Sequence, residues 1–265
     1  MEGLPTSYTL GPLPQISLFG LQIPTYHLII SLTCCLCVYW FYKRCEVRNL
    51  SQRNAMDISM IVLITGFVGA RLAHVLWEYP SYYWQNPVEV FYFWQGGFVF
   101  YGGAILGYLC AFLYARRLKL TFWLWHDTAA PVLALGYALG RIACFLEGCC
   151  YGKVCTLPWA IPLKEVDVHS HAITTALRHP TQIYASLMEA CTLFFLLWLE
   201  KKKAKLGVVF LSWVMLHALG RILMEIFRDD PRGPMLMGLS VSTMISLIFI
   251  GLAGMTLRAR LREPH

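Results

Sequence analysis

Seven apolar runs constrain the fold of this chain more than any other feature of its sequence. Each run approaches the roughly 17–25 residues that a helix needs to cross a lipid bilayer. The runs begin near Pro24, Ile58, Phe98, Thr128, Gln182, Leu206 and Leu236. With 57% of its 265 residues hydrophobic and only 14% charged, the chain is too apolar for an ordinary soluble domain. The sequence therefore predicts an all-α polytopic membrane protein of about seven transmembrane helices.

The distribution of basic residues predicts how these helices are oriented. Of the 22 Lys and Arg residues, 14 lie in segments 43–53, 116–119, 201–205 and 258–262, which share one side of the membrane if seven helices alternate. The positive-inside rule assigns that side to the cytoplasm. We therefore expect the N-terminus outside and the C-terminus inside. The net charge of +7 is then explained by the basic loops that orient the helices in the membrane, and no nucleic-acid partner is expected.

We expect a single transmembrane domain over residues 1–265, because no internal repeat or low-complexity segment interrupts the chain. The largest outer insertion, about residues 145–180, is too polar and too broken to span the membrane. We predict that it forms a small periplasmic head over the helices. Each predicted cytoplasmic loop is short and basic, so functional chemistry is expected on the outer side.

Three arginines, Arg71, Arg141 and Arg221, lie inside or at the edge of apolar runs. A guanidinium group near the bilayer centre costs at least ~2.5 kcal/mol, so it normally faces a partner or a polar cavity. Three such groups on different segments predict a pocket that holds an anion. An alternative for Arg71 is an ion pair with Glu78 or Glu89 near the same outer edge.

The segment from residue 140 to 152 carries several groups that suit a ligand site. Arg141 and Glu147 lie near the outer end of an apolar helix that has Asp127 near its start. Gly148 and Gly152 would let the backbone approach a ligand closely. The same pattern also fits a helix end with a snorkelling arginine and a glycine turn, and the sequence leaves both interpretations open.

A stripe of ionisable residues marks the sixth apolar run. His217, Arg221, Glu225 and Arg228 are spaced by four, four and three residues, so they share one face of a helix. An Arg221–Glu225 pair would neutralise itself, but two arginines for one glutamate leave positive charge for an external anion. For His217, a structural hydrogen bond to Glu225 or to a backbone carbonyl is as well supported as a role as a base.

Two further motifs favour structural interpretations. Tyr101 precedes the pair Gly102 and Gly103 at the start of the third run. Their N–H groups could bind an oxyanion, but a glycine pair taken alone favours close helix packing. The segment beginning at His179 predicts a helix start with Thr181 as its N-cap.

Four cysteines gather near the outer face: Cys144, Cys149, Cys150 and Cys155. With His169, His171 and His179 nearby, a zinc site is conceivable, but the spacing is not C-x2-C and adjacent cysteines do not easily ligate one ion. A disulfide from Cys149 or Cys150 to Cys155 is favoured first, free thiols second and a metal site last. We therefore expect no metal.

Taken in order, these motifs resemble the bacterial prolipoprotein diacylglyceryl transferases over about residues 26–247. The family signature runs Gly-Arg, a small apolar pair, Asn, an aromatic residue, Gly and a later Gly, and it matches Gly140, Arg141, Phe145, Gly148 and Gly152. Other matching positions are Tyr26, Arg71, Gly102, Gly103, Asp127, Arg221, Glu225, Arg228 and the intact stretch from His179.

The chain departs from the family pattern at four positions. Tyr101 replaces the family's His, and His217 replaces a Tyr. Cys144 replaces the signature Asn, and Cys149 a later acidic residue, so the chain resembles a cysteine-bearing sub-branch. The missing His leaves two candidates for the general base, Tyr101 and His217.

The resemblance implies an enzyme of lipoprotein biosynthesis in the bacterial inner membrane. It would transfer the diacylglyceryl group of phosphatidylglycerol to the lipobox cysteine thiol of a preprolipoprotein signal peptide, releasing glycerol 1-phosphate, without metal or nucleotide. The implied catalytic residues are Arg141, Arg221, Tyr101 and His217. The implied substrate-binding residues are Tyr26, Arg71, Gly102, Gly103, Asp127, Glu147, Gly148, Gly152, Glu225 and Arg228. Alternatives are a paralogue with another acceptor and, less favoured because no repeat is visible, an anion-binding transporter.

Overall fold

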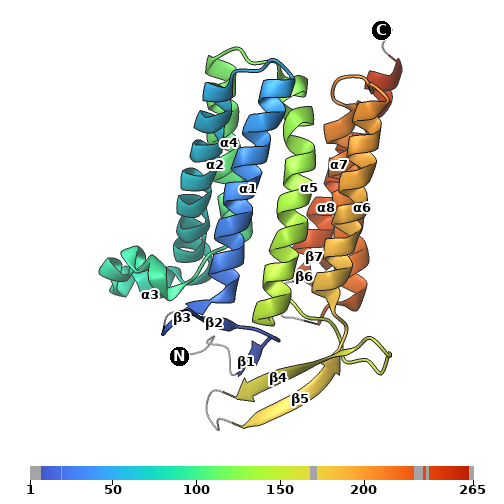
Figure 1. Ribbon diagram of the computed structural model, residues 1–265. Coiled ribbons are helices and arrows are strands. Elements are labelled where there is room, and N and C mark those ends of the chain that lie inside the picture. Colours follow the sequence, from blue (N-terminus) through green and yellow to red (C-terminus); the bar gives the residue numbers. More distant parts are fainter. Residues whose placement is uncertain (1–6, 19, 168–171, 230–234, 237–238, 263–265) are drawn as a thin grey trace. The chain divides into compact units, whose positions relative to one another are not determined.

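Long helices dominate the structure, a computed structural model that describes residues 7–18, 20–167, 172–229, 235–236 and 239–262. The helices of 18 residues or more in this part are α1 (Thr25–Val47), α2 (Gln52–Ala73), α4 (Phe100–Arg117), α5 (Phe122–Glu147), α6 (Thr181–Lys201), α7 (Val208–Phe227) and α8 (Val241–Arg262), as Figure 1 shows.

Six helical segments of the described chain are long and apolar enough to cross a membrane. They are Thr25–Val47, Gln52–Glu78, Phe122–Glu147, Thr181–Lys201, Val208–Phe227 and Val241–Arg262. The second of them continues α2 through the π-helical turn η1 (His74–Glu78). The prediction of a helical, polytopic membrane protein is thus confirmed. The expected third span corresponds to α4, which ends in Arg116 and Arg117 and is not among the six, so the count of seven stays a prediction.

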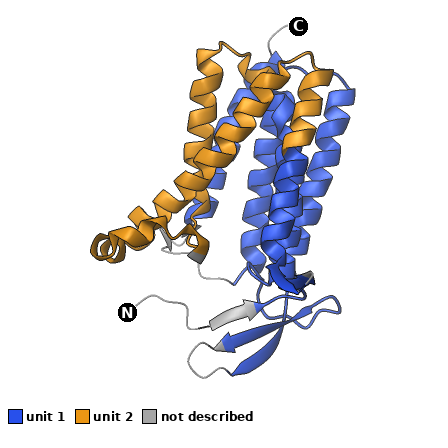
Figure 2. Cartoon of the chain, turned by 60° about the vertical axis from the view of Figure 1, so that its left-hand side comes forward, with its two compact units in different colours: residues 1–37, 126–265 blue, residues 38–125 orange. Residues whose placement is uncertain are grey.

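The chain forms two compact units, coloured separately in Figure 2. Unit 1 consists of residues 1–37 and 126–265, and unit 2 of residues 38–125. The helix α1 contributes its first part to unit 1 and its last part to unit 2.

Unit 2 is built on close packing between α2 and α4. A Cβ atom on Gly103 would lie 2.6 Å from the carbonyl oxygen of Gly66, and one on Gly69 would lie 2.6 Å from that of Gly102. Side chains at these positions would force the two backbones apart. The packing interpretation of the Gly102–Gly103 pair is therefore confirmed. Short helices join α2 to α4: α3 (Pro80–Gln85), η2 (Pro87–Phe91) and η3 (Phe93–Gln95).

Unit 1 contains the bundle of α5, α6, α7 and α8, in which α7 packs against both α6 and α8. Its buried core brings together small and branched residues, Ala130 and Ala134 of α5 with Leu196 of α6 and Val209 of α7. Small side chains on α5 let these helices approach closely, which is the normal solution in a membrane, where burial in lipid offers no net hydrophobic gain.

The outer insertion predicted over about 145–180 contains a β-hairpin, β4 (Ile161–Asp167) with β5 (Ile173–Arg178). The N-terminal strand β1 (Ser7–Leu10) pairs antiparallel with β4, giving the strand order β1-β4-β5. Two further hairpins are β2 (Gln15–Leu18) with β3 (Leu21–Pro24), and β6 (Met235–Leu236) with β7 (Leu239–Ser240). The hairpin β4–β5 lies at the end of unit 1 where α5 ends and α6 begins (Figure 1).

Candidate active site

A glycine turn ends α5 and starts the loop that carries much of the site. Gly148 has a φ of 94°, a conformation that favours glycine, and its N–H donates to the carbonyl of Cys144 at 3.0 Å. The N-terminal segment crosses here, because Gly11 N donates to the carbonyl of Glu147 at 2.8 Å. A Cβ atom on Gly148 would lie 2.7 Å from the Cα of Gly11. The helix end and the glycine turn expected in this segment are thus present, while its role toward a ligand stays a prediction.

The first residues of α6 fix the loop that follows. The Gln182 side chain donates to the carbonyl of Cys149 at 2.6 Å, and the Thr181 hydroxyl donates to that of Cys150 at 2.9 Å. Both side chains are buried, at 1% and 2% exposure. The prediction that Thr181 caps α6 is wrong, because Pro180 occupies the N-cap position and the hydroxyl is used by the loop.

Gly152 lets this loop approach the end of α7. It forms a β-bridge with Arg228, and a Cβ atom there would lie 2.7 Å from the carbonyl oxygen of Phe227. The next residue, Lys153, donates from its backbone N–H to the same carbonyl at 2.8 Å and from its ammonium group to that of Ile226 at 3.0 Å. The predicted close approach at Gly152 is therefore between two parts of the protein rather than toward a ligand.

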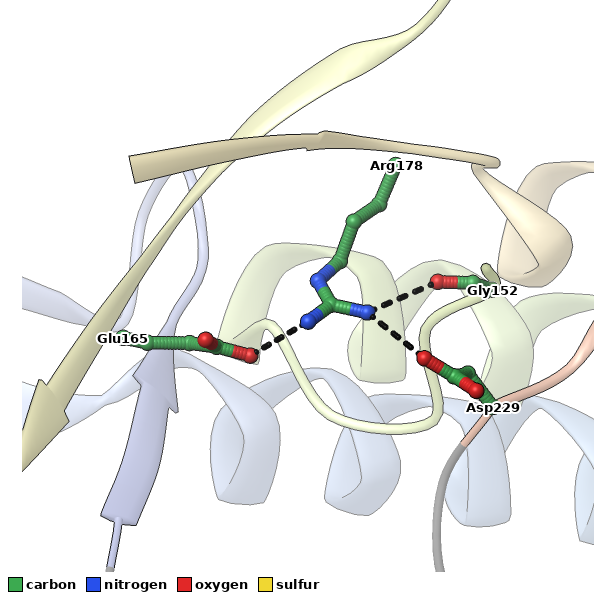
Figure 3. A network of polar contacts seen from close by, with 4 residues as sticks. All are labelled: Gly152, Glu165, Arg178 and Asp229. Carbon is green, nitrogen blue, oxygen red and sulfur yellow. Dashed lines mark hydrogen bonds and ion pairs between the residues drawn. The ribbon is translucent and has the colours of Figure 1, made fainter. Parts of the chain in front are cut away.

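Arg178, at the end of β5, connects the hairpin to this loop (Figure 3). Its guanidinium group donates to Glu165 of β4 at 2.7 Å, to Asp229 after α7 at 3.1 Å and to the carbonyl of Gly152 at 3.3 Å. It also lies 4.5 Å from the ring centroid of Tyr151. The sequence did not indicate this network, because the partners of Arg178 are distant along the chain.

Tyr137 links Arg141 to a pocket between three helices. The Arg141 guanidinium lies over the Tyr137 ring, one helical turn earlier on α5, at 4.7 Å from its centroid. The same ring meets His217 of α7 edge-on, with centroids 4.6 Å apart. The pocket is lined by Tyr137, by Ala185, Met188 and Glu189 of α6, and by His217, Gly220, Arg221 and Met224 of α7. Arg221 therefore lines this pocket, whereas Arg141 contacts Tyr137, which lines it.

Neither of these arginines is neutralised in the described part of the chain. None of its ion pairs includes Arg141 or Arg221. Arg221 instead donates to the neutral hydroxyl of Ser242, in α8, at 2.7 Å. Guanidinium groups that form no ion pair with a described residue favour an anionic ligand, and the one carboxylate among the residues that line the pocket, Glu189, is engaged by His217 and Trp213.

A buried carboxylate, Glu189, orients His217. Its Oε2 lies 3.0 Å from Nδ1 of His217, and its Oε1 accepts from the Trp213 indole at 2.8 Å. Glu189 is only 4% exposed. The predicted partners of His217, Glu225 or a backbone carbonyl, were wrong. Sequence reasoning missed Glu189, although a lone carboxylate in an apolar run was the signal that could have found it.

Three cysteine thiols gather where α5 ends. The Sγ atoms of Cys144, Cys149 and Cys150 all lie within 4.8 Å of one another. Hydrogen bonds from the Cys144 and Cys149 thiols, and the nearby guanidinium groups of Arg228 and Arg141, hold the pKa of the Cys150 thiol below its ordinary value. Hydrogen bonds with the Cys144 and Cys150 thiols raise the pKa of the Cys149 thiol.

The predicted disulfide to Cys155 is not present. All ten cysteines, each of which falls in the described part, are free. Cys155 lies outside the thiol cluster, where its N–H donates to the carbonyl of Leu177 in β5 at 3.0 Å. His169 and His171 lie outside the described residues.

Two other predicted residues of unit 1, Tyr26 and Arg228, lie near the same thiols. Tyr26, in the first turn of α1, interacts electrostatically with Arg141 and with the three thiols. One carboxylate oxygen of Glu147 is buried without a hydrogen-bond partner among the described residues. Glu225 lies on α7, and Arg228 forms its C-cap.

Asp127 has a different role from the predicted one. Its two oxygens accept hydrogen bonds from the backbone N–H groups of Gly207 and Phe210 at 2.6 and 2.8 Å, so it caps the N-terminus of α7. Along α5 it lies about 21 Å from Arg141, at ~1.5 Å per residue. We therefore reassign Asp127 from substrate binding to helix capping.

Arg71, a predicted site residue of unit 2, is bound by backbone carbonyls of the same unit. Arg71 is 7% exposed and donates to the carbonyls of Glu89, Val90 and Gly96 at 2.8, 3.1 and 2.6 Å. The predicted pair with a carboxylate is therefore wrong: Arg71 holds the backbone that joins α2 to α4. Roles for Tyr101, Gly102 and Gly103 toward a substrate stay predictions.

The fold and the pocket define a class of protein: a polytopic helical membrane protein in which Arg221 and a Glu189–His217 pair line one pocket, and Arg141 contacts Tyr137 of the same pocket. Comparison with known proteins specifies the family. A family model described as prolipoprotein diacylglyceryl transferase matches residues 14–258. The chain belongs to this family.

Named relatives agree with this assignment. The chain is 35% identical over 238 residues to the phosphatidylglycerol--prolipoprotein diacylglyceryl transferase of Clostridium tetani (strain Massachusetts / E88), covering 88% of this chain and 91% of the relative. It is 32% identical over 267 residues to that of Bordetella avium (strain 197N), covering 98% and 97%. It is also 32% identical over 240 residues to transferase 2 of Clostridium perfringens (strain 13 / Type A), covering 91% of each.

Proposed function

We propose that this protein transfers the diacylglyceryl group of phosphatidylglycerol to the lipobox cysteine thiol of a preprolipoprotein signal peptide, releasing glycerol 1-phosphate. Family membership supports the donor and the acceptor, since the relatives are named for both. One structural observation supports it most directly: Arg221 lines the pocket and Arg141 contacts Tyr137 of the same pocket, and neither enters an ion pair with a described residue.

The two arginines would stabilise the leaving group. In the transfer, the acceptor sulfur forms a bond to a glyceryl carbon while the bond from that carbon to a phosphate oxygen breaks. Negative charge therefore grows on the departing glycerol phosphate. Guanidinium groups aimed at those oxygens act most strongly where water is excluded. The buried oxygen of Glu147 that lacks a partner among the described residues would accept a hydrogen bond from a glycerol hydroxyl.

His217 is our proposed general base. A free thiol with a pKa of ~8.5 is a few per cent ionised at neutral pH, so only modest assistance is needed. With Nδ1 held by Glu189, Nε2 of His217 is left to take the thiol proton, and the carboxylate would stabilise the imidazolium that results. Departing phosphate oxygens then offer a route for that proton to leave.

Seven spans, with α4 added to the six apolar segments, belong to the same proposal. The N-terminus would lie outside, the C-terminus inside, and the protein would reside in the bacterial inner membrane. This orientation supports the chemistry, because it exposes the ends of α5 and α7 near the thiol cluster to the outer surface, where a secreted acceptor arrives.

A transfer assay tests the function. Purified protein in detergent is mixed with phosphatidylglycerol and a lipobox peptide, and release of glycerol phosphate is measured. The matched control is the same peptide with serine in place of its cysteine, from which no product is expected. Without peptide-dependent release from well-folded protein, the proposed reaction would be wrong.

Two variants test the anion pocket in that assay. Arg141→Ala and Arg221→Ala are each expected to lower kcat/KM by at least about 10²-fold, the usual loss for one donor to a developing anion. Arg117→Ala removes an exposed arginine at the end of α4 and is expected to act like the wild type. Wild-type turnover in either pocket variant would refute the phosphate-binding role.

A further inference from the structure

The thiol cluster at the end of α5 has the geometry of a metal site. A tetrahedral ion with three thiolate ligands at ~2.3 Å holds their sulfurs about 3.8 Å apart. In the structure the Sγ atoms of Cys144, Cys149 and Cys150 already lie within 4.8 Å of one another. Shifts of well under an ångström for each side chain would therefore suffice to bind one ion.

Local backbone conformation explains how neighbouring cysteines converge. Gly148 and Cys150 both have positive φ, 94° and 62°, so the chain reverses after α5 and turns again between the adjacent cysteines. This brings Cys149 and Cys150 back to Cys144 in the last turn of the helix. The objection that adjacent cysteines do not easily ligate one ion does not hold for this turn.

The cluster is held in place by residues outside it. The carbonyls of Cys149 and Cys150 accept hydrogen bonds from the buried side chains of Gln182 and Thr181. A loop fixed in this way has little conformational freedom left to lose when an ion binds. Supporting contacts of this kind raise metal affinity, and losing one typically costs about 10–100-fold.

Charge around the cluster also suits thiolates. Three thiolates and one divalent ion leave one residual negative charge. Arg228 and Arg141 interact electrostatically with Cys150, so cations are already placed to offset it. Sulfur ligands select thiophilic ions with a filled d shell over hard ions such as Mg²⁺.

We propose that Cys144, Cys149 and Cys150 form a binding site for one thiophilic d¹⁰ cation, Zn²⁺ or Cu⁺. Three protein ligands leave a tetrahedral ion one position for water or an external ligand. The site does not depend on the transfer reaction, and metal binding is measured without turnover. Failure of one proposal therefore leaves the other standing.

The test is the metal content of the full-length protein. It is purified in detergent with a thiol-free reductant and without chelator, then loaded with Zn²⁺ or, anaerobically, with Cu⁺. After free metal is removed, we expect one ion per chain by elemental analysis. Each of Cys144→Ser, Cys149→Ser and Cys150→Ser should weaken affinity by at least about tenfold, since losing a ligand costs no less than losing its support. The matched control Cys155→Ser, a free thiol of the same loop, should retain wild-type affinity.

A second measurement on unaltered protein covers the case in which the serine variants do not fold. Co²⁺ in place of Zn²⁺ should give thiolate-to-metal charge-transfer absorption in the near ultraviolet, and adding Zn²⁺ should abolish it. No charge-transfer band together with substoichiometric metal would overturn the proposal. Thiol titration of the protein as isolated, before reduction, gives a further test. The proposal would also be overturned if two of the three cysteines form a disulfide there and the protein binds no metal after that disulfide is reduced. Equal affinity in the Cys150→Ser and Cys155→Ser proteins would also refute it.

Discussion

Nδ1 of His217 lies 3.0 Å from Oε2 of Glu189, which joins α7 to α6 through a polar contact inside the membrane-spanning bundle. The second oxygen of Glu189 accepts from the Trp213 indole, and Trp213 stacks on the His217 ring with centroids 5.4 Å apart. Glu189 therefore fixes the position of the imidazole and engages its Nδ1. Burying an ionisable carboxylate within the membrane costs free energy, so such a group normally has a functional role.

Glu189→Gln is expected to lower kcat by about 10²-fold or more, the size of a general-base contribution, with a smaller change in KM. Glutamine has nearly the same shape but cannot stabilise an imidazolium. His217→Gln should cause a similar loss, and the double variant should lose little more than either single one, because the two residues act as a unit. Steady-state glycerol phosphate release measures all three.

The control for the Glu189 prediction is Glu46→Gln, which removes an exposed carboxylate paired with Lys43. It should leave kcat unchanged. Full activity of His217→Gln would remove His217 from the chemistry, and multiplicative losses in the double variant would show that the pair does not act together.

If His217 is the base, Tyr101 is not needed for proton transfer. Tyr101→Phe is therefore expected to retain kcat/KM within about threefold, since it removes one hydroxyl from a side chain that is 36% exposed and costs less than a lost catalytic group. The same transfer assay checks this, with His217→Gln measured beside it. A loss of tenfold or more in the phenylalanine variant would assign the chemical role to Tyr101 instead.

Much of the helical architecture followed from the sequence, because the length of an apolar run reports on a membrane-spanning helix directly. Runs of apolar residues predicted the long helices, and the polar insertion predicted the head. The sheet in that head was not predicted, because β1 pairs with β4 across more than 150 residues of sequence, and local patterns do not encode such a partner.

The site was predictable only in part, for the same reason. Arg141, Arg221 and His217 stood out as polar groups in apolar helices. The structure places Arg221 and His217 at one pocket and Arg141 over Tyr137, which lines the same pocket. Their partners Glu189 and Ser242 lie on other helices, so spacing along one helix suggested Glu225 instead. Asp127 and Arg71 were recognised as charges in or beside apolar runs, but a charge satisfied by backbone groups has the same sequence signature as one that meets a ligand.

The capping role of Asp127 predicts a change in stability without a change in chemistry. Asp127→Ala leaves the N–H groups of Gly207 and Phe210 without their acceptor, and it should lower the free energy of unfolding by about 1–2 kcal/mol, as for other lost helix caps. Thermal unfolding in detergent measures the shift. Neither Asp229 nor Asp57 is a suitable control position, because Asp229 accepts a hydrogen bond from Arg178 and Asp57 accepts one from Tyr114. Asp127→Asn, which keeps one oxygen acceptor, is the matched variant and should recover part of the loss. A fall in kcat per folded molecule would return Asp127 to the active site.

Arg178 provides the corresponding test of the head. Arg178→Met keeps most of the aliphatic chain but breaks the contacts to Glu165, Asp229 and the carbonyl of Gly152. It should cost about 1–3 kcal/mol of stability, because it leaves charged and polar partners unsatisfied. The hairpin β4–β5 should then become sensitive to limited proteolysis in the folded protein, before the helices unfold. Lys164→Met, on the exposed face of β4, controls for loss of a charge and should leave the hairpin resistant. Equal resistance of both variants would mean that strand pairing with β1, rather than the Arg178 network, holds the head in place.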